Sequence, residues 1–299
     1  MENEGRPQAE LAGEPARPAA WLLLLALLGG NVALAIGPWF VRVADTGPVA
    51  AGFWRLMLAL PFLVVLAKVN GQRLTGMPVT TLALVALGAV TFALDLASWH
   101  IGIGMTRLGN ATLFGNAGSI VLLFWGFIVH RVLPRRLEWL AIIFALSGAA
   151  ILMGRSLEIS NATLIGDLFA VAAGLLYAVY LLTLQGARGQ FGSWSLLVWV
   201  SLFGAPVLLV LALALGEPVW PQDWGPIIGL FILSQLVGQG LMVFALKYFP
   251  PLVVGLALLT QPVVASIYGW LAFGEVLSGM DIVGMLLVGA ALAVSRARA

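Results

Sequence analysis

Residues 145–155 read ALSGAAILMGR and residues 286–296 read LLVGAALAVSR, and the likeness of these two segments is the strongest indication of how the chain is organised. Both segments are apolar, both contain Gly-Ala-Ala, and each places an arginine seven residues after its glycine, at Arg155 and Arg296. Upstream, Arg131-Val132-Leu133 and Glu275-Val276-Leu277 stand at the matching joint, and a gap of three residues aligns both pieces. The matches indicate an internal duplication whose two copies end at these segments.

The composition around these segments places the chain in a lipid environment. It has 299 residues, of which 61% are hydrophobic and 9% charged, and its mean hydropathy is +1.04. A soluble domain carries about 25% charged residues, whereas this apolar content suffices for roughly nine or ten spans of about 20 residues each. An open sheet cannot satisfy its backbone in lipid, and the apolar runs are too long for barrel strands. We therefore predict an all-α integral membrane protein.

Hydropathy divides the chain into a disordered leader at 1–19 and ten transmembrane helices. Five helices fall in each copy, at 20–155 and 156–299, and because five is odd the second copy must cross in the opposite sense. The prediction is two inverted five-helix repeats around a central cavity. The expected helices are 20–42, 48–67, 78–103, 108–130, 136–154, 162–186, 194–216, 225–247, 251–272 and 278–296.

The basic residues predict the orientation, since Lys and Arg are retained on the cytoplasmic side. With the N-terminus inside, eleven of them fall in cytoplasmic stretches, three fall outside, and Arg55 lies within a span. Both termini are therefore expected in the cytoplasm. The apolar run from Trp21 continues to Phe40 behind an acidic leader, so cleavage as a signal peptide is the less favoured alternative.

Several chemistries are excluded by composition. The chain has no cysteine, two histidines and no GxxxxGK[ST] loop, so thiolate metal sites and an ATP-hydrolysing motor are not expected. Its basic residues are scattered over short loops and form no nucleic-acid-binding face. Without a Ser/His pair at helical spacing or an acidic dyad in one span, an intramembrane enzyme is disfavoured. We expect no catalytic residue, no metal and no cofactor.

Amide side chains at mid-depth are the first candidates for a cargo site, because polar groups in lipid usually face protein or a cavity. An amide both donates and accepts hydrogen bonds without burying a net charge, which suits a zwitterionic cargo. The alternative is that these amides only hold helices together. They are Asn31 in the first span, Asn116 in the fourth, Gln235 and Gln239 in the eighth, and Gln261 in the ninth.

Aromatic residues on two spans predict a wall that would accept apolar or aromatic side chains. Tyr177 and Tyr180 share a face of the sixth span, and Trp99 shares a face of the third span with Thr91 and Asp95, with Phe92 nearby. The alternative is ordinary aromatic packing or, for Trp99, a place in the interfacial belt.

Charged residues within spans are rare and need partners. Arg55 and Asp95 are expected at similar depth, which predicts a structural ion pair between the second and third spans. Alternatively, Asp95 meets a cargo ammonium or carries a coupling proton, with His100 as a second titratable site. Glu275, at the outer end of the ninth span, is expected to be a helix-end or gate residue.

Helix breakers predict hinges. Pro262 is expected to interrupt the ninth span near its middle and Pro38 the first span towards its outer end, while Gly115 and Gly118 loosen the fourth. Such breaks create partial helix ends that can hold charged groups of a cargo.

The chain resembles the drug/metabolite transporter superfamily, with its ten spans and paired EamA-type repeats. The residues that carry the resemblance are Arg55, Gly166-Asp167-Leu168-Phe169, Gln261-Pro262-Val263-Val264-Ala265, the stretch from Tyr268 to Glu275, and Gly284 with Gly289-Ala290. The first copy departs from the pattern, because His130-Arg131 stands where the family usually has Gly-Glu. Trp99-His100-Ile101-Gly102 looks most like the bacterial branch that exports aromatic and other amino acids.

The resemblance implies a secondary transporter that exports amino acids, with broad selectivity including aromatic and other apolar ones, across the bacterial inner membrane by alternating access. Its expected partners are an amino acid substrate and the lipid bilayer. Proton coupling and the choice between monomer and homodimer stay open. The alternatives are an exporter of another solute, such as a drug or metabolite, and a scaffold subunit without cargo.

Overall fold

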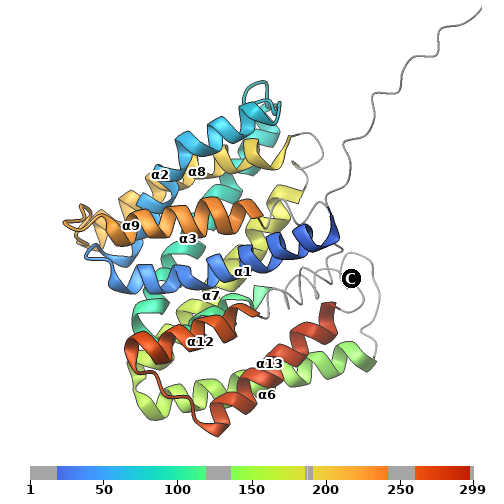
Figure 1. The fold of residues 1–299 in the computed structure, drawn as a ribbon, viewed down its shortest axis with the longest axis vertical. Coiled ribbons are helices and arrows are strands. Elements are labelled where there is room, and N and C mark those ends of the chain that lie inside the picture. The colour runs from blue at the N-terminus through green and yellow to red at the C-terminus, as the bar shows by residue number, and fades with distance from the viewer. Residues whose placement is uncertain (1–18, 119–135, 186, 188–190, 242–259, 297–299) are drawn as a thin grey trace, which may run out of the picture.

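The computed structural model describes residues 19–118, 136–185, 187, 191–241 and 260–296, and the regular structure in these ranges is helical. Figure 1 shows the helices lying side by side, with the start of α1 and the end of α13 at the same end of the bundle. We call the opposite end, where α1 is joined to α2, the far end. Most of the predicted leader, His130, the second half of the fourth predicted span and the first part of the ninth lie outside the described residues.

Each of the ten predicted spans contains a helix. Five helices, namely α1, α2, α3, α7 and α8, are long and apolar enough to cross a membrane. The bounds are α1 Ala20–Val43, α2 Pro48–Val69, α3 Val79–Met105, α4 Leu108–Gly115, α6 Arg136–Ile159, α7 Asn161–Gln185, α8 Ser193–Ala214, α9 Gly225–Gly229, η1 Leu230–Gly238, α12 Thr260–Phe273 and α13 Gly279–Arg296.

The expected helix breaks are only partly observed. Helix α1 runs without interruption through Pro38, as proline is tolerated in lipid where neighbours satisfy the freed backbone group. The break predicted at Pro262 stays a prediction, because Pro262 lies in α12 only two residues after Thr260 and residues 242–259 lie outside the described residues. Helix α4 does end at Gly115, with Asn116 as its C-cap. The sequence pattern missed η1, a π-helical segment that continues α9, and such segments occur often at functional sites.

Helices α2 and α8 cap one another in the manner that an inverted duplication requires. The Glu217 carboxylate, just after α8, accepts from the backbone N–H of Ala50 at 2.9 Å, in the first turn of α2. The side chain of Gln72, just after α2, accepts from the backbone N–H of Ser195 at 3.0 Å, in the first turn of α8. Ser195 and Glu217 stand 145 positions after Ala50 and Gln72, so the same contact is made twice, at opposite ends of the pair.

Two tryptophans repeat this relation. Trp54 Nε1 donates to the backbone carbonyl of Val219 at 2.7 Å, and Trp199 Nε1 donates to the backbone carbonyl of Leu74 at 3.0 Å. These residues are again related by 145 positions. Other helix pairs follow the same symmetry, because α1 packs on η1 as α7 packs on α3, and α1 packs on α12 as α7 packs on α4. The structure therefore confirms two inverted repeats related by a pseudo-two-fold axis.

The helices approach closely where glycines meet, and their apolar side chains face outward. A Cβ at Gly102 would lie 2.8 Å from the carbonyl oxygen of Gly166, and one at Gly148 would lie 2.7 Å from that of Gly284. Small residues at such crossings allow tight packing in lipid. Large apolar side chains such as Leu146 are exposed on the outside, while polar groups are buried inside, as expected when lipid is the solvent.

Candidate functional site

The central polar contact of the bundle joins Arg55 of α2 to Gln235 of η1. Arg55 Nε donates to Gln235 Oε1 at 3.0 Å, and the two residues are only 3% and 1% exposed. Arg55 Nη1 and Gln235 Nε2 are buried and have no hydrogen-bond partner among the described residues. This contact crosses from the first repeat to the second.

The predicted ion pair between Arg55 and Asp95 is not formed. Asp95, on α3, lies within electrostatic range of the Arg55 guanidinium, but the described residues contain no ion-pair or hydrogen-bond contact between them. Tyr177 and His100 also lie within electrostatic range of the guanidinium. The structure therefore brings four of the predicted site residues around Arg55, with Gln235 as the residue it touches.

The predicted aromatic wall is assembled from α3 and α7. The ring of Phe92 stacks on that of Tyr180 with centroids 4.7 Å apart, and Tyr177 lies 5.5 Å from Tyr180 and 6.4 Å from Phe92. Phe92 and Asp95 are three residues apart and so share a face of α3. The aromatic cluster is therefore adjacent to the charged groups.

Asn31 and Gln261 form a second buried contact between the repeats. Gln261 Nε2 donates to Asn31 Oδ1 at 2.9 Å, and Asn31 Nδ2 donates to the carbonyl of Leu27 at 2.8 Å. Both side chains are buried, and each stands 12 residues from the end of its helix at the far end, Asn31 in α1 and Gln261 in α12. This contact therefore joins the two repeats through amide groups.

The remaining amides and Trp99 occupy more peripheral positions. Trp99 Nε1 donates to the carbonyl of Ala111 at 3.1 Å, which ties α3 to α4. Asn116 Nδ2 donates to the carbonyl of Thr112 at 3.0 Å within α4. Gln239, one turn beyond Gln235, is half-buried.

His100 is fully buried against α2. Its Nδ1 lies 2.9 Å from the carbonyl oxygen of Pro48, which can only accept, so Nδ1 carries the proton and the opposite nitrogen Nε2 is an acceptor. That Nε2 has no partner among the described residues. In the neutral imidazole, His100 therefore offers an unused acceptor, whereas Arg55 and Gln235 each offer an unused donor.

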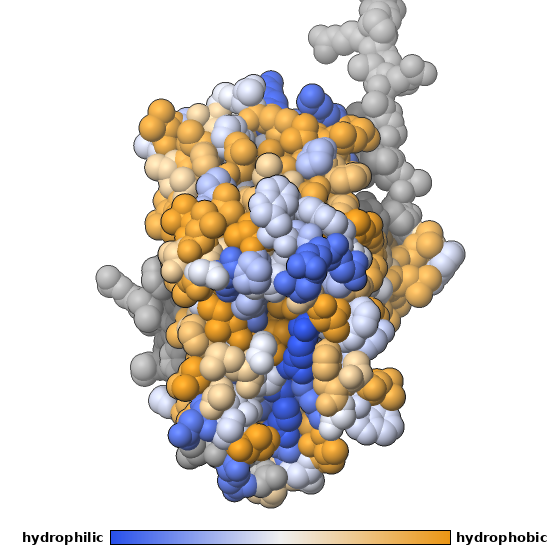
Figure 2. Space-filling model, turned by 90° about the vertical axis from the view of Figure 1, so that its left-hand side faces the viewer, coloured by the Kyte–Doolittle hydropathy of each residue, from blue (hydrophilic) through white to orange (hydrophobic). Residues whose placement is uncertain are grey.

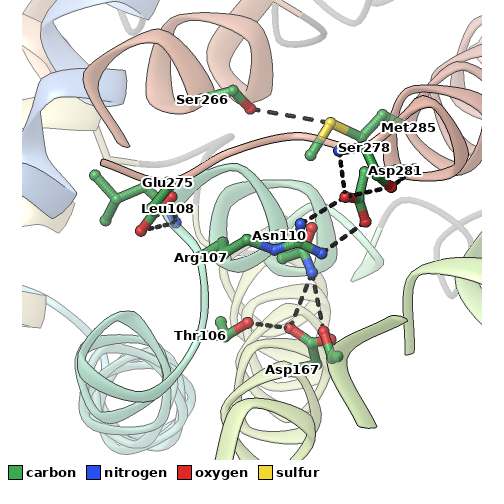
Figure 3. A network of polar contacts seen from close by, with 11 residues as sticks. Thr106, Arg107, Leu108, Asn110, Asp167, Ser266, Glu275, Ser278, Asp281 and Met285 are labelled. Atoms are coloured by element: carbon green, nitrogen blue, oxygen red, sulfur yellow. Dashed lines mark hydrogen bonds and ion pairs between the residues drawn. The ribbon is translucent and has the colours of Figure 1, made fainter. Parts of the chain in front are cut away.

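A polar network at the far end was not foreseen from the sequence (Figure 3). Arg107, which precedes α4, makes a bidentate ion pair with Asp281 of α13, with both N···O distances at 2.7 Å. The backbone N–H and the hydroxyl of Ser278 also donate to Asp281, at 2.8 and 2.9 Å. The spacing Ser278-x-x-Asp281 is a capping box at the start of α13, a signal the sequence carries.

Asp167 of α7 forms the deeper part of this network. Its Oδ1 accepts from the hydroxyl of Thr106, and Asn110 Nδ2 lies 3.2 Å from Ser156 Oγ and 3.5 Å from Asp167 Oδ1. Asp167 Oδ2 is buried without a partner among the described residues. Asp167 belongs to a stretch that resembles the family pattern, but no signal in the sequence joins it to Thr106, 61 positions away.

Glu275 lies at the far end, two residues after the last residue of α12. Its carboxylate forms an ion pair with Arg42 of α1 and accepts from the backbone N–H of Leu108 at 3.0 Å, at the first residue of α4. The Arg42 guanidinium also lies 4.6 Å over the ring of Phe273. The Glu275 carboxylate also stabilises α4, because a negative charge at a helix N-terminus is favourable.

Viewed from the far end, hydrophilic residues form a band with hydrophobic residues on both sides (Figure 2).

Comparison with known proteins identifies the family. A model described as the EamA-like transporter family matches residues 20–154 and 164–296, which together make up most of the chain. The chain belongs to this family. The protein is therefore a multi-pass membrane transport protein of the drug/metabolite transporter superfamily, with a small-molecule substrate, and is not an enzyme.

Curated relatives of this EamA-like transporter align over almost their whole length. The threonine/homoserine exporter RhtA of Salmonella typhimurium is 24% identical over 283 residues, which cover 94% of this chain and 93% of the exporter. RhtA of Escherichia coli is 24% identical over 287 residues, with coverages of 95% and 94%. An uncharacterized transporter of Archaeoglobus fulgidus is 27% identical over 282 residues, with coverages of 92% and 95%.

A solved crystal structure shares the fold of this transporter. It superposes with a TM-score of 0.61 at 15% sequence identity, and the match covers 95% of this chain and 100% of that chain. At this identity the likeness concerns the arrangement of the helices.

Proposed function

We propose that this protein exports amino acids, including aromatic and other apolar ones, across the bacterial inner membrane by alternating access. The halves that move against each other are residues 20–155 and 156–299, and both termini and the leader lie in the cytoplasm. The far end of the bundle then faces outward. Candidate cargo contacts are Asn31, Asp95, Trp99, His100, Asn116, Tyr177, Tyr180, Gln235, Gln239 and Gln261.

The observation that carries the proposal is the buried site around Arg55. Charged, amide and aromatic groups meet there from α2 and α3 of the first repeat and from α7 and η1 of the second. Arg55 and Asp95 carry opposite charges, do not pair with each other and lie beside aromatic rings. This arrangement suits a cargo that carries an ammonium, a carboxylate and an apolar side chain. Transporters built of inverted repeats bind cargo at such an interface. The relatives from Salmonella typhimurium and Escherichia coli are exporters of threonine and homoserine, which supports the same class of cargo.

The far-end contacts supply the closure that alternating access requires. Arg42 and Arg107 belong to the first repeat, whereas their partners Glu275 and Asp281 belong to the second. Both ion pairs found within the described residues therefore join the two halves at this end. For cargo to leave outward, these pairs must separate, and the cost of separation has to be offset by contacts formed in the outward-open state.

Transport into liposomes tests the proposal directly. Purified protein in proteoliposomes should take up labelled threonine and phenylalanine at rates above those of empty vesicles. Unlabelled amino acids should compete with both, and a fluorescent organic cation should not. No flux of any amino acid, or inhibition only by the cation, would overturn the amino acid assignment in favour of another solute.

A variant with alanine at Asn31, Asn116 and Gln239 together distinguishes a carrier from a scaffold. We expect this triple variant to lose transport while it still assembles in the membrane. Full biological activity of the triple variant in cells would instead support a scaffold without cargo.

A further inference from the structure

The contact between Arg55 and Gln235 leaves two hydrogen-bond donors unused. The amide oxygen of Gln235 already accepts from Arg55 Nε at 3.0 Å, so the amide nitrogen remains as a donor. That nitrogen and Arg55 Nη1 are both buried and lack an acceptor among the described residues. The two side chains are hydrogen-bonded to each other, so their two unsatisfied donors mark a single place where an acceptor would be bound.

Such an arrangement is costly if it serves only to hold helices. A buried donor left unsatisfied costs about 1–3 kcal/mol, and more when it is charged. The pair of Asn31 and Gln261 shows the contrasting case, because its amide groups join α1 to α12 and none of their atoms is among the buried unsatisfied ones. The unsatisfied donors of Arg55 and Gln235 are instead suited to a ligand that brings its own acceptors.

A carboxylate fits these donors. It offers two acceptor oxygens and a negative charge to a guanidinium N–H and an amide N–H, and such charge-assisted bonds are about twice as strong as neutral ones. Gln235 lies within η1, where the π-helical turn changes the direction of the side chain relative to a regular α-helix. The π-helical turn therefore places the amide against Arg55.

The opposite charge lies close by on α3. Asp95 is buried, interacts electrostatically with Arg55 without touching it, and makes no hydrogen bond to another described residue. Ionisable residues within spans often mark the path of a substrate, and a zwitterion would bring an ammonium for Asp95 and a carboxylate for Arg55. Phe92 on the same face of α3, with Tyr180, provides an apolar surface next to the carboxylate.

We propose that Arg55 and Gln235 bind the α-carboxylate of the cargo, while Asp95 faces its α-ammonium and the rings of Phe92 and Tyr180 contact its side chain. This inference rests on the proposed function and deepens it, since it assigns a cargo contact to Arg55. It restricts the cargo to molecules with a free carboxylate, and it makes Arg55 the residue that distinguishes an amino acid from the corresponding amide or amine.

The test compares ligands that differ only at the carboxylate. Threonine and threoninamide, and phenylalanine and phenylalaninamide, are used as unlabelled competitors of labelled threonine and phenylalanine uptake by proteoliposomes. Wild type should bind the acid of each pair about 10- to 100-fold more tightly than its amide. Arg55→Gln should weaken binding of the acid by a similar factor and change binding of the amide by less than about twofold. The discrimination between acid and amide then disappears.

Controls separate this inference from a folding defect and from the proposed function. Arg73→Gln removes the same charge from an exposed loop and should keep the wild-type discrimination. If Arg55→Gln does not fold, as judged by gel filtration, Gln235→Met is tested in its place and should reduce the discrimination in the same way. If the folded variant binds acid and amide equally more weakly, the assignment of Arg55 to the carboxylate is overturned. The proposal that the protein transports amino acids is not affected by that result. Absence of wild-type amino acid uptake would overturn the proposed function itself.

Discussion

The Asp281 carboxylate allows the far-end closure to be tested with a single substitution. Asp281→Asn keeps the shape of the side chain and removes the charge that pairs with Arg107 through two 2.7 Å contacts. Removing one partner of a buried ion pair costs about 3–5 kcal/mol, and the asparagine oxygen recovers part of this by accepting one hydrogen bond. A net loss of about 2 kcal/mol would raise the ratio of open to closed far end about 30-fold.

The assay uses the absence of cysteine from the chain. A single Thr91→Cys substitution places a thiol on the face of α3 that carries Asp95, one turn away, at a site that is 9% exposed. Thr91 stands 14 residues before Met105, the last residue of α3, so a reagent from the far end must travel about 21 Å along the bundle. We expect a membrane-impermeant thiol reagent applied from that side to label the Asp281→Asn protein up to about 30-fold faster than its parent.

Asp223→Asn is the matched control, because Asp223 is an exposed far-end carboxylate that only accepts from its own loop at Gly225. It should leave the labelling rate unchanged. An Asp281→Asn protein that is folded, by gel filtration and thermal unfolding, and is labelled at the parent rate would refute the role of the ion pair in closure.

Four further substitutions test three other contacts. Glu275→Gln removes the ion pair with Arg42 and weakens the cap of α4, so the thermal midpoint in detergent should fall by about 2–4 °C; an unchanged midpoint would contradict this. Tyr180→Leu removes aromatic stacking and should lower phenylalanine uptake about tenfold while threonine uptake changes less than about twofold, whereas equal losses would argue against an aromatic cargo contact. Asn31→Leu and Gln261→Leu should each lower the free energy of unfolding. In the double variant the two effects should differ from additivity by about 0.6 kcal/mol. Strictly additive effects would show that the hydrogen bond between the two side chains adds no stability.

The spans and the duplication were predictable because both depend on local or linear features of the chain. A helix in lipid satisfies its own backbone, so each apolar run of sufficient length forms a span wherever it packs. The structure also reveals a second sign of the duplication, beyond the likeness of residues 145–155 to residues 286–296. Pro61 and Pro206, like Trp54 and Trp199, are separated by 145 positions, and this spacing is visible in the sequence once it is looked for.

The partners within the site could not be predicted in the same way. Depth along the helices suggested that Arg55 would pair with Asp95, but the guanidinium reaches Gln235, 180 positions away. The error arose because depth fixes only one coordinate of a side chain, whereas a hydrogen bond also depends on the rotation of each helix and on which helices adjoin. The π-helical turn of η1 changes that rotation locally, and no periodicity in the residues announces it.

The bundle of membrane-spanning helices, its inverted repeats and the presence of amides, aromatic rings and a few charges in the spans all follow from the amino-acid sequence. The pairing of these polar groups is visible in the folded protein alone, where contacts across the two halves join Arg55 to Gln235, Asn31 to Gln261, and Arg107 to Asp281. The physical reason is that transfer into lipid acts on each segment separately, whereas the pairing of polar groups is set by how helices from distant parts of the chain pack.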